Sequence, residues 1–407
     1  MGLLNASTSA PRAYPTQDQP LRVLLISHTC RSAAMGQPKA RLLGQLPGIQ
    51  LRVLVPDRWR NDDGGRTPVD QHIDDSFQLE IGKVRWPFTR LFKRYYHHYP
   101  MLRKTLEDFQ PHVIDIWEEP WGLVSAHVCS LRRKMLPSAK IISETEQNLD
   151  RWYPPPFQAI RRYVLRRADF VIARSSEALT LAHKKGFNGP GEVVPNAVDA
   201  ELFHPMDRAA CRKKLDVHGF VVGYVGRMVE EKGIQDLLKA LPLCPTDSQV
   251  NVLLVGGGDY LPALKDQAHR LNLGSRIAFL AARPLSQLPE LFNAMDVLAL
   301  PSRTVPKWKE QFGRVIIEAH ACAIPVIGSL SGAIPEVIGG GGLTFAERNP
   351  KALAATILRL AADPALGVRM GAVGRQQVEE HYTWQRVAEQ MYNIYNRLAP
   401  ARAGKKD

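Results

Sequence analysis

Apolar runs of strand length alternate with helix-like stretches along most of the chain, and this alternation restricts the fold more than any other feature of the sequence. The first half contains five such runs, at 21–28, 51–56, 112–117, 139–144 and 169–175. Helix-like stretches lie between them, for example at 95–109 and 156–168. Continuous apolar runs are typical of strands that are buried on both faces. Strands alternating with helices predict βαβ units and a parallel sheet covered by helices.

A second alternating series follows a connection at 192–205, EVVPNAVDAELFHP, which is rich in turn-forming residues. Its strand-like runs are 220–227, 249–259, 276–281, 296–302 and 324–329. Its helix-like stretches are 234–241, 261–271, 285–295 and 312–323. The stretch 381–399 places apolar residues three and four positions apart, which predicts a final amphipathic helix.

The fold class that follows is α/β, with two Rossmann-like, doubly wound parallel-sheet domains that face each other across a cleft. A chain of 407 residues is long enough for two such domains. We expect domains at 21–203 and 204–382 and a last helix at 383–400. We also expect a disordered leader at 1–20 and a tail at 401–407.

Composition excludes several classes of protein. Five scattered cysteines without a Cys-x-x-Cys pair predict buried thiols in a reducing cytoplasm, with neither disulfides nor a zinc site. No apolar stretch approaches the roughly 18 residues that a membrane-spanning helix needs. The net charge of +13 suggests an anionic partner. Nucleic acid is the first candidate from charge alone, but no nucleic-acid motif accompanies it.

Cations and glycines follow two strands of the second series. Arg227 ends the run 220–227, and Lys232 follows it in a short loop before a helix. Two cations near a helix N-terminus can hold a diphosphate, although surface charge is the simpler interpretation of each alone. Gly257 and Gly258 follow the next strand, where they either allow close approach to a ligand or only form a tight turn.

Two glutamates, Glu310 and Glu318, flank a Phe-Gly pair in KEQFGRVIIEAHACAIPVIGS, residues 309–329. Gly313 is expected near the start of a helix, where free N–H groups can face a phosphate. Eight residues of helix span roughly 12 Å, which is comparable to the distance from hexose to ribose in a sugar nucleotide. Ionised carboxylates accept hydrogen bonds from sugar hydroxyls. Solvated helix charge is the alternative interpretation of this pair.

Taken together, these stretches resemble the family-4 retaining glycosyltransferases, nucleotide-sugar enzymes of the two-Rossmann GT-B architecture. The resemblance rests on VPNAVDAELFHP, VGYVGRMVEEKG, LLVGGGD, DVLALPS, EQFGRVIIEAHACAIPVIGSLSGAIPEVI and YTWQRVAEQMYNIY, which occur in this order over about 192–395. It implies an N-terminal acceptor domain, a C-terminal donor domain, and a last helix that packs back on the first domain.

The resemblance also implies roles for individual residues. Glu310 contacts the donor sugar and Glu318 the ribose, while Arg227 and Lys232 hold the diphosphate. The other residues that we expect on the donor side are Gly257, Gly258, Arg283, Phe312, Gly313 and Arg314.

The N-terminal half departs from the family pattern at two places. Many members carry a glycine pair after the first strand, whereas the loop SHTCRSAAMGQPK contains only Gly36. Many also carry a histidine after the fourth strand, where this chain reads DIWEEPWG. We therefore expect a carboxylate, Glu118 or Glu119, to receive the acceptor proton or to bind acceptor hydroxyls, with salt bridges to nearby arginines as the alternative. The remaining acceptor-side candidates are His28, Gly36, Glu144, Glu146 and Asn148.

The function that we predict is metal-independent transfer of a hexosyl unit, with retention, from a UDP- or GDP-sugar to an acceptor in glycan, glycolipid or exopolysaccharide synthesis. No Asp-x-Asp motif occurs, so neither a metal nor another cofactor is implied. A nucleotide-sugar epimerase or phosphorylase on the same fold is one alternative, and a basic nucleic-acid-binding protein is another. The missing dinucleotide fingerprint disfavours an NAD-dependent enzyme.

The acceptor is expected to be a carbohydrate or a lipid-linked molecule. The segment 83–104 holds seven Lys and Arg residues, no acidic residue and several aromatic ones. Such a segment suits peripheral contact with an anionic membrane. We therefore expect a cytoplasmic protein that docks on the inner face of a membrane, with a solvated basic surface as the alternative.

Overall fold

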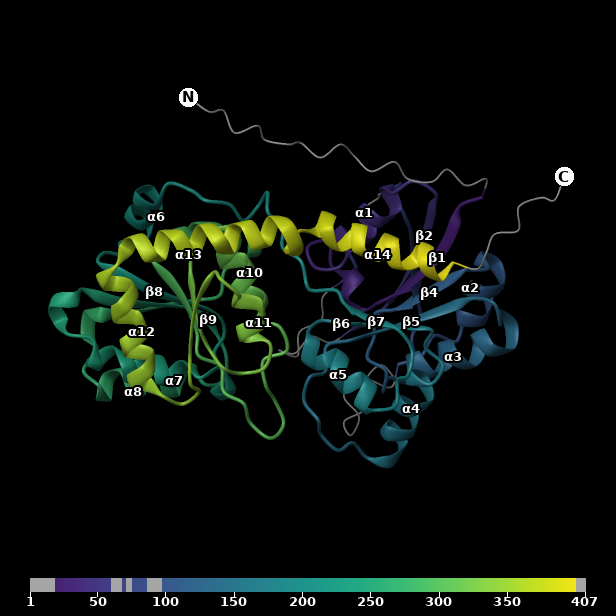
Figure 1. Cartoon of the computed structure of the whole chain (residues 1–407), viewed down its shortest axis with the longest axis horizontal. Helices are drawn as coiled ribbons and strands as arrows, with labels where there is room; N and C mark the ends of the chain where they lie inside the picture. The colour runs from purple at the N-terminus through teal and green to yellow at the C-terminus, as the bar shows by residue number, and fades with distance from the viewer. Residues whose placement is uncertain (1–18, 60–67, 71–74, 86–96, 400–407) are drawn as a thin grey trace, which may run out of the picture.

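Two parallel sheets, one from each half of the sequence, form the two halves of the molecule (Figure 1). The structure is a computed structural model, and it describes residues 19–59, 68–70, 75–85 and 97–399. The two separate parallel sheets confirm the predicted fold class.

The N-terminal sheet has the strand order β3-β2-β1-β4-β5-β6-β7, and all neighbouring strands are parallel. Its strands are β1 (Leu21–Ile26), β2 (Ile49–Pro56), β3 (Gln78–Gly82), β4 (Val113–Ile116), β5 (Lys140–Thr145), β6 (Phe170–Ala173) and β7 (Gly191–Val193). The order reverses direction between β1 and β4. In open α/β sheets, ligands bind beyond the carboxyl ends of the strands at such a point.

Helices cover both faces of this sheet because successive side chains of a strand point to opposite faces. Val23 and Leu25 of β1 pack in one cluster with α1 and the last helix, whereas Leu24 and Ile26 pack in another with α2, α3 and α4. The helices of this half are α1 (Gln37–Gln45), α2 (Leu102–Phe109), α3 (Leu123–Met135), α4 (Pro155–Leu165) and α5 (Ser176–Lys184).

The C-terminal sheet repeats the same topology, in the order β10-β9-β8-β11-β12-β13. Its strands are β8 (Phe220–Arg227), β9 (Val250–Gly257), β10 (Ile277–Leu280), β11 (Val297–Leu300), β12 (Val326–Ser329) and β13 (Gly342–Phe345). The helices of this half are α6 (Arg208–Leu215), α7 (Ile234–Ala240), α8 (Leu261–Arg270), α9 (Leu288–Ala294), α10 (Arg314–Ala321), α11 (Ile334–Ile338), α12 (Pro350–Ala362) and α13 (Pro364–Gln377). Here the order reverses between β8 and β11, so the residues after these strands are the ones placed to meet a ligand.

The last helix, α14 (Trp384–Leu398), crosses from the C-terminal half to the N-terminal half (Figure 1). A π-helical turn at Val378–Tyr382 joins it to α13, and the Thr383 side chain accepts a hydrogen bond from the backbone N–H of Arg386 at its start. The N–H of Val198 donates to the carbonyl of Tyr382 at 2.8 Å, so the two connections between the halves lie side by side. Buried residues of α14, among them Met391 and Tyr395, complete the core on one face of the N-terminal sheet.

Every strand expected from the sequence forms, and the strands that were not expected, β3, β7 and β13, all lie at the edges of the sheets. Edge strands are only partly covered, and none of these three is a continuous apolar run. Several helices are shorter than expected; for example, α2 begins only at Leu102, after Pro100, and α9 only at Leu288, after a 3-10 turn at Leu285–Gln287. All five cysteines are buried, as predicted. Among the described residues, no helix is both long and apolar enough to cross a bilayer.

Candidate active site

A cavity of about 370 Å³ lies between the two halves. Its N-terminal wall consists mainly of residues at or after the carboxyl ends of β1, β4 and β5, the positions expected from the strand order, together with Trp59 after β2 and Arg174 after β6. Its C-terminal wall is the loop that precedes α10. Four indoles contribute to the lining, those of Trp59, Trp117, Trp121 and Trp308. Aromatic faces beside carboxylates form a suitable surface for a sugar ring, which has both apolar faces and hydroxyl edges.

His28 and Glu118 meet at the point where the order of the N-terminal strands reverses. The backbone N–H of His28 donates to Glu118 Oε1 at 2.6 Å, and His28 Nδ1 lies 2.8 and 2.9 Å from the two carboxylate oxygens. Trp59 stacks on the imidazole with ring centroids 4.1 Å apart. Burial disfavours the charged form of Glu118, but the His28 charge and hydrogen bonds outweigh it and hold the pKa of that carboxyl below its usual value. The imidazole is therefore held in a fixed orientation at the cavity wall.

Glu119 is bound to the segment that follows β5. Its carboxylate accepts hydrogen bonds from Thr145 Oγ1 at 2.7 Å and from the backbone N–H of Glu146 at 2.9 Å. Burial outweighs these bonds and raises the pKa of Glu119 to about 8. A carboxyl with such a pKa exchanges a proton near neutral pH, which is the property that a general acid or base needs.

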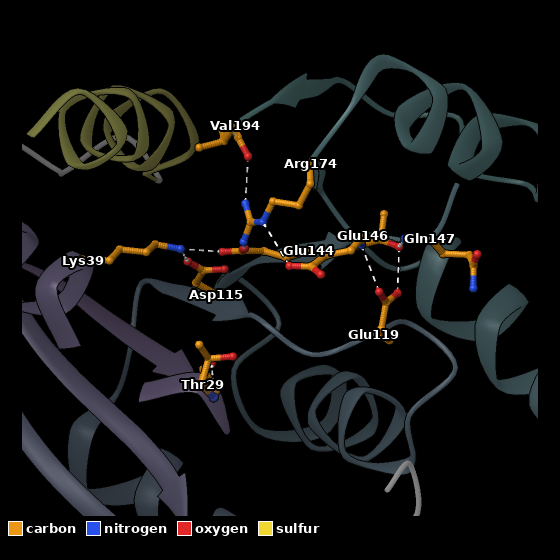
Figure 2. A network of polar contacts seen from close by, with 11 residues as sticks. Thr29, Lys39, Asp115, Glu119, Glu144, Glu146, Gln147, Arg174 and Val194 are labelled. Carbon is orange, nitrogen blue, oxygen red and sulfur yellow. Dashed lines mark hydrogen bonds and ion pairs between the residues drawn. The ribbon is translucent and has the colours of Figure 1, made fainter. Parts of the chain in front are cut away.

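Glu144 belongs to a buried network of charges, which Figure 2 shows from close by. It pairs with Arg174, and Lys39 Nζ lies 2.7 Å from Glu144 Oε1 and 3.6 Å from Asp115 Oδ2. Burial opposes its ionised form, but the two cations lower the pKa of Glu144 to about 2. Tyr395 of α14 donates to Asp115 Oδ2 at 2.6 Å, and this bond attaches the last helix to the network. Glu144 therefore forms ion pairs inside the protein with Lys39 and Arg174, although it also lines the cavity.

On the donor side, Lys232 and Glu310 form an ion pair. Lys232 Nζ lies 2.7 Å from Glu310 Oε2, which also accepts a hydrogen bond from Ser302 Oγ at 2.8 Å. Ser302 follows β11 and Lys232 follows β8, so this cluster lies where the C-terminal strand order reverses. Trp308 lies beside it, with its ring centroid 5.0 Å from Lys232 Nζ.

The remaining donor-side candidates cluster around the same edge. The pairing of β8 with β9 places Arg227 directly beside Gly257, and Arg227 and Gly258 are both exposed. Gly313 precedes α10 with a φ of 81°, a left-handed conformation that favours glycine. Burial raises the pKa of Glu318, in the second turn of α10, to about 7.

Three further candidates lie around α10 and β10. Phe312 is buried and Arg314 reaches Met35 Sδ of the N-terminal half at 3.0 Å, whereas Arg283 is exposed.

Two acceptor-side candidates make contacts within the protein that the sequence did not indicate. Gly36 packs against the backbone of Thr29 and Cys30, where an added Cβ would lie 2.6 Å from main-chain atoms. Its contact is therefore internal to the loop. Asn148 is buried in the cavity wall and bonds to the main chain of Glu310 across the cavity.

Several residues in or near the cavity wall were not predicted from the sequence. Trp308 precedes Glu310 by two positions, and Ser302 ends the expected strand 296–302, so their proximity to predicted residues was the available signal. Lys39 and Asp115 gave no signal, because a lysine in a helix and an aspartate in a strand acquire a role only when the sheet brings them together. The described residues contain no group of three or more His, Cys, Asp and Glu side chains that could hold a metal ion.

The two sheets, their shared strand order and a polar cavity between them define the class of two-domain glycosyltransferases with the GT-B fold. Comparison with known proteins agrees with this class: the model described as glycosyl transferases group 1 matches residues 206–377, and the model described as Glycosyltransferase Family 4 matches residues 41–202. The chain belongs to the family-4 glycosyltransferases. This confirms the predicted family and the predicted class of enzyme.

Similar proteins include enzymes of mycobacteria and their relatives. The chain is 27% identical over 305 residues to a D-inositol 3-phosphate glycosyltransferase of Corynebacterium jeikeium, covering 70% of this chain and 69% of that protein. It is 30% identical over 275 residues to a GDP-mannose-dependent alpha-(1-6)-phosphatidylinositol monomannoside mannosyltransferase of Mycobacterium tuberculosis, covering 64% of this chain and 70% of that protein. For several other curated relatives, the aligned part spans about half of the relative's length.

Among solved structures, HepE of Anabaena in complex with UDP superimposes with a TM-score of 0.71 at 19% identity, covering 92% of this chain and 99% of that one. At this identity the likeness establishes the shared fold.

Proposed function

We propose that this chain transfers a hexosyl unit from a nucleoside-diphosphate sugar to an acceptor hydroxyl, with retention of the anomeric configuration. The observation that carries the proposal is the cluster of Lys232, Glu310 and Ser302. It lies where the C-terminal strand order reverses, next to Trp308, Lys309 and Gln311 of the loop that lines the cavity. The opposite wall of the cavity carries His28, Glu118 and Glu119. The anionic donor and the hydroxyl-bearing acceptor thus each have a surface of matching chemistry.

In this proposal the donor lies along the carboxyl ends of β8, β9 and β11. Arg227 and Lys232 neutralise the diphosphate, and the free N–H groups at the start of α10 face it near Gly313. Glu318 accepts hydrogen bonds from the ribose hydroxyls, and Glu310 accepts one from the donor sugar. Lys232 must exchange its present partner, Glu310, for phosphate oxygens, which frees the carboxylate for the sugar.

The chemical step that we propose needs no protein nucleophile. The acceptor hydroxyl attacks the anomeric carbon from the face that the diphosphate leaves, and a departing phosphate oxygen takes the hydroxyl proton. Negative charge on the diphosphate grows in the transition state, where Arg227 and Lys232 stabilise it. The positive charges of these two residues supply this stabilisation from the chain itself, so we propose a metal-independent transfer.

The acceptor in this proposal is a polyol or a lipid-linked carbohydrate. The names of two relatives, which refer to inositol 3-phosphate and to a phosphatidylinositol monomannoside, support this class. They also support GDP-mannose as one donor to test, and UDP-sugars are the other. Half of the segment 83–104, on which the predicted membrane contact depends, lies outside the described residues, so that contact stays a prediction.

The two alternatives from the sequence have less support. Both family models describe glycosyl transferases, which disfavours an epimerase. The cavity is lined by four indoles and by equal numbers of acidic and basic side chains, which is not the predominantly basic surface that binds nucleic acid.

Thermal unfolding with added nucleotides tests the proposed function. UDP or GDP at about 100 times its dissociation constant should stabilise the protein by about 2.7 kcal/mol, with and without EDTA. Glu318→Ala should reduce this effect, because a hydrogen bond to a charged group contributes about 1.5–3 kcal/mol. An unchanged melting temperature with both nucleotides would contradict the donor site, and a strict requirement for a divalent cation would contradict the metal-independent step.

A further inference from the structure

One side chain of the N-terminal half reaches the main chain of Glu310. Asn148 lies three residues after β5 and is only 3% exposed. Its Nδ2 donates to the carbonyl oxygen of Glu310 at 2.7 Å. The backbone N–H of Ala333 donates to the same oxygen at 3.1 Å. One carbonyl thus joins three segments that are distant in the sequence.

The packing around this carbonyl leaves no room for another side chain. Gly332 has a φ of 55°, and a Cβ added there would lie 1.9 Å from the Glu310 oxygen and 3.0 Å from Asn148 Nδ2. A glycine is therefore required at 332 if Asn148 is to reach Glu310. Gly332 of the C-terminal half thus leaves the space that the Asn148 side chain of the N-terminal half occupies.

The orientation of the amide is defined by chemistry. Only Nδ2 can donate to a carbonyl, and within the described part of the chain Asn148 Oδ1 has no hydrogen-bond partner. The bond to Glu310 is therefore the contact that fixes the side chain. A second contact between the same segments, from Arg151 Nη1 to the carbonyl of Lys307, is long, at 3.4 Å.

The main chain at 310 and the carboxylate at 310 thus have different partners. Asn148 of the N-terminal half holds the main chain, while Lys232 and Ser302 of the C-terminal half hold the carboxylate. Any movement that separates the halves breaks the first contact and leaves the second intact. The position of Glu310 relative to the cavity therefore depends on whether the halves are together.

We propose that Asn148 is a positioning residue for Glu310, which makes the reactivity of the donor depend on closure of the two halves. This inference rests on the proposed function, in which Glu310 contacts the donor sugar. Asn148 itself touches no substrate in this account. Its loss should lower the rate of the chemical step and leave nucleotide affinity unchanged, since Arg227, Lys232 and Glu318 all belong to the C-terminal half.

The experiment compares Asn148→Ala and Asn148→Asp with the wild-type protein. Two quantities are measured: the release of nucleoside diphosphate from UDP-glucose and GDP-mannose with water as the acceptor, and the affinity for UDP and GDP by calorimetry. We expect kcat to fall five- to tenfold in Asn148→Ala and further in Asn148→Asp, where a carboxylate replaces the donor that faces the carbonyl. Affinity for the nucleoside diphosphate should stay within twofold.

Ser176→Ala is the matched control. Ser176 Oγ donates to Glu336 Oε1 at 3.0 Å, so this variant also loses a hydrogen bond between the halves, but at a site that does not line the cavity. It should keep kcat within twofold. Melting temperatures show whether each variant folds. If Asn148→Ala does not fold, the nearly isosteric Asn148→Asp provides the test.

Three results would overturn the inference: unchanged kcat in both Asn148 variants, an equal loss in Ser176→Ala, or a parallel loss of nucleotide affinity. A wild-type protein that binds neither nucleotide and cleaves neither sugar nucleotide would instead refute the proposed function, and the inference with it.

Discussion

Tyr395→Phe should separate the contribution of the buried charge network from ordinary packing of α14. The substitution removes one hydroxyl and keeps the ring in place. That hydroxyl donates to Asp115 Oδ2 at 2.6 Å, and both residues are fully buried. The variant therefore tests a single hydrogen bond between the last helix and the N-terminal sheet.

The expected cost depends on the charge of Asp115. Burial and the charge of Glu144 raise the pKa of Asp115 to about 7. Its other oxygen, Oδ1, has no partner among the described residues, and Lys39 Nζ is 3.6 Å from Oδ2. Above pH 8 the variant would leave a buried carboxylate with one distant cation, which places the cost near the upper end of the range for charged groups, about 3 kcal/mol. At pH 5.5 the carboxyl is protonated, and the cost should fall to about 1 kcal/mol.

The direction in which the cost of Tyr395→Phe changes with pH follows from the linkage between folding and proton binding. A carboxyl whose pKa is raised by folding stabilises the folded state fully below its unfolded pKa, and this contribution is lost as the pH rises through the folded pKa. The Tyr395 hydroxyl stabilises the charged form of Asp115, so its removal raises the pKa of Asp115 further. The difference in unfolding free energy between variant and wild type should therefore grow from pH 5.5 to pH 8.5.

The assay is urea unfolding followed by circular dichroism at pH 5.5 and 8.5. Tyr392→Phe is the control on the same helix, because the Tyr392 hydroxyl donates to the neutral carbonyl of Pro47 at 3.0 Å. Its cost should be about 1 kcal/mol and independent of pH. A Tyr395→Phe variant that unfolds like the control at both pH values would refute this account of the network.

Two other predictions concern the cavity. Glu119→Gln should raise stability relative to wild type at pH 8.5 but not at pH 4.5, because the raised pKa of Glu119 means that folding favours its protonated form. Thermal unfolding of variant and wild type with the same dependence on pH would contradict this. Glu310→Ala should lower the transfer rate about 100-fold while UDP or GDP binds as well as or better than before, since Lys232 is released from its ion pair. Calorimetry that shows a large loss of nucleotide affinity would instead place Glu310 in nucleotide binding.

The architecture was predictable because buried strands carry an unmistakable apolar pattern. The missed strands β3, β7 and β13 lie at sheet edges, where partial exposure removes that pattern. The end of the expected helix 95–109 was placed correctly, but its start was not, because Pro100 disfavours helical geometry in the residue before it.

The donor-side candidates were predictable to the extent that they follow strands directly. Arg227 and Lys232 were singled out because they follow a strand, Glu310 because of its spacing from Glu318, and the family resemblance supplied their expected roles; the structure brings Lys232 and Glu310 together. The acceptor side was harder, since its contacts join residues far apart in sequence, such as His28 with Glu118. No local pattern shows that one carboxylate after a strand, Glu144, is neutralised by Lys39 and Arg174, whereas another, Glu119, is left with a raised pKa.

The crossing of α14 determines the order in which the two halves can be completed during synthesis. The N-terminal half leaves the ribosome first, yet the sheet face that α14 covers stays open until residues near 395 have emerged. Until then, the hydroxyl partner of Asp115 is missing and apolar side chains remain exposed to solvent or to other chains. Domains usually fold as units from the N-terminus onward. In this chain the core of the half that is made first is completed only after the whole of the second half has been synthesised.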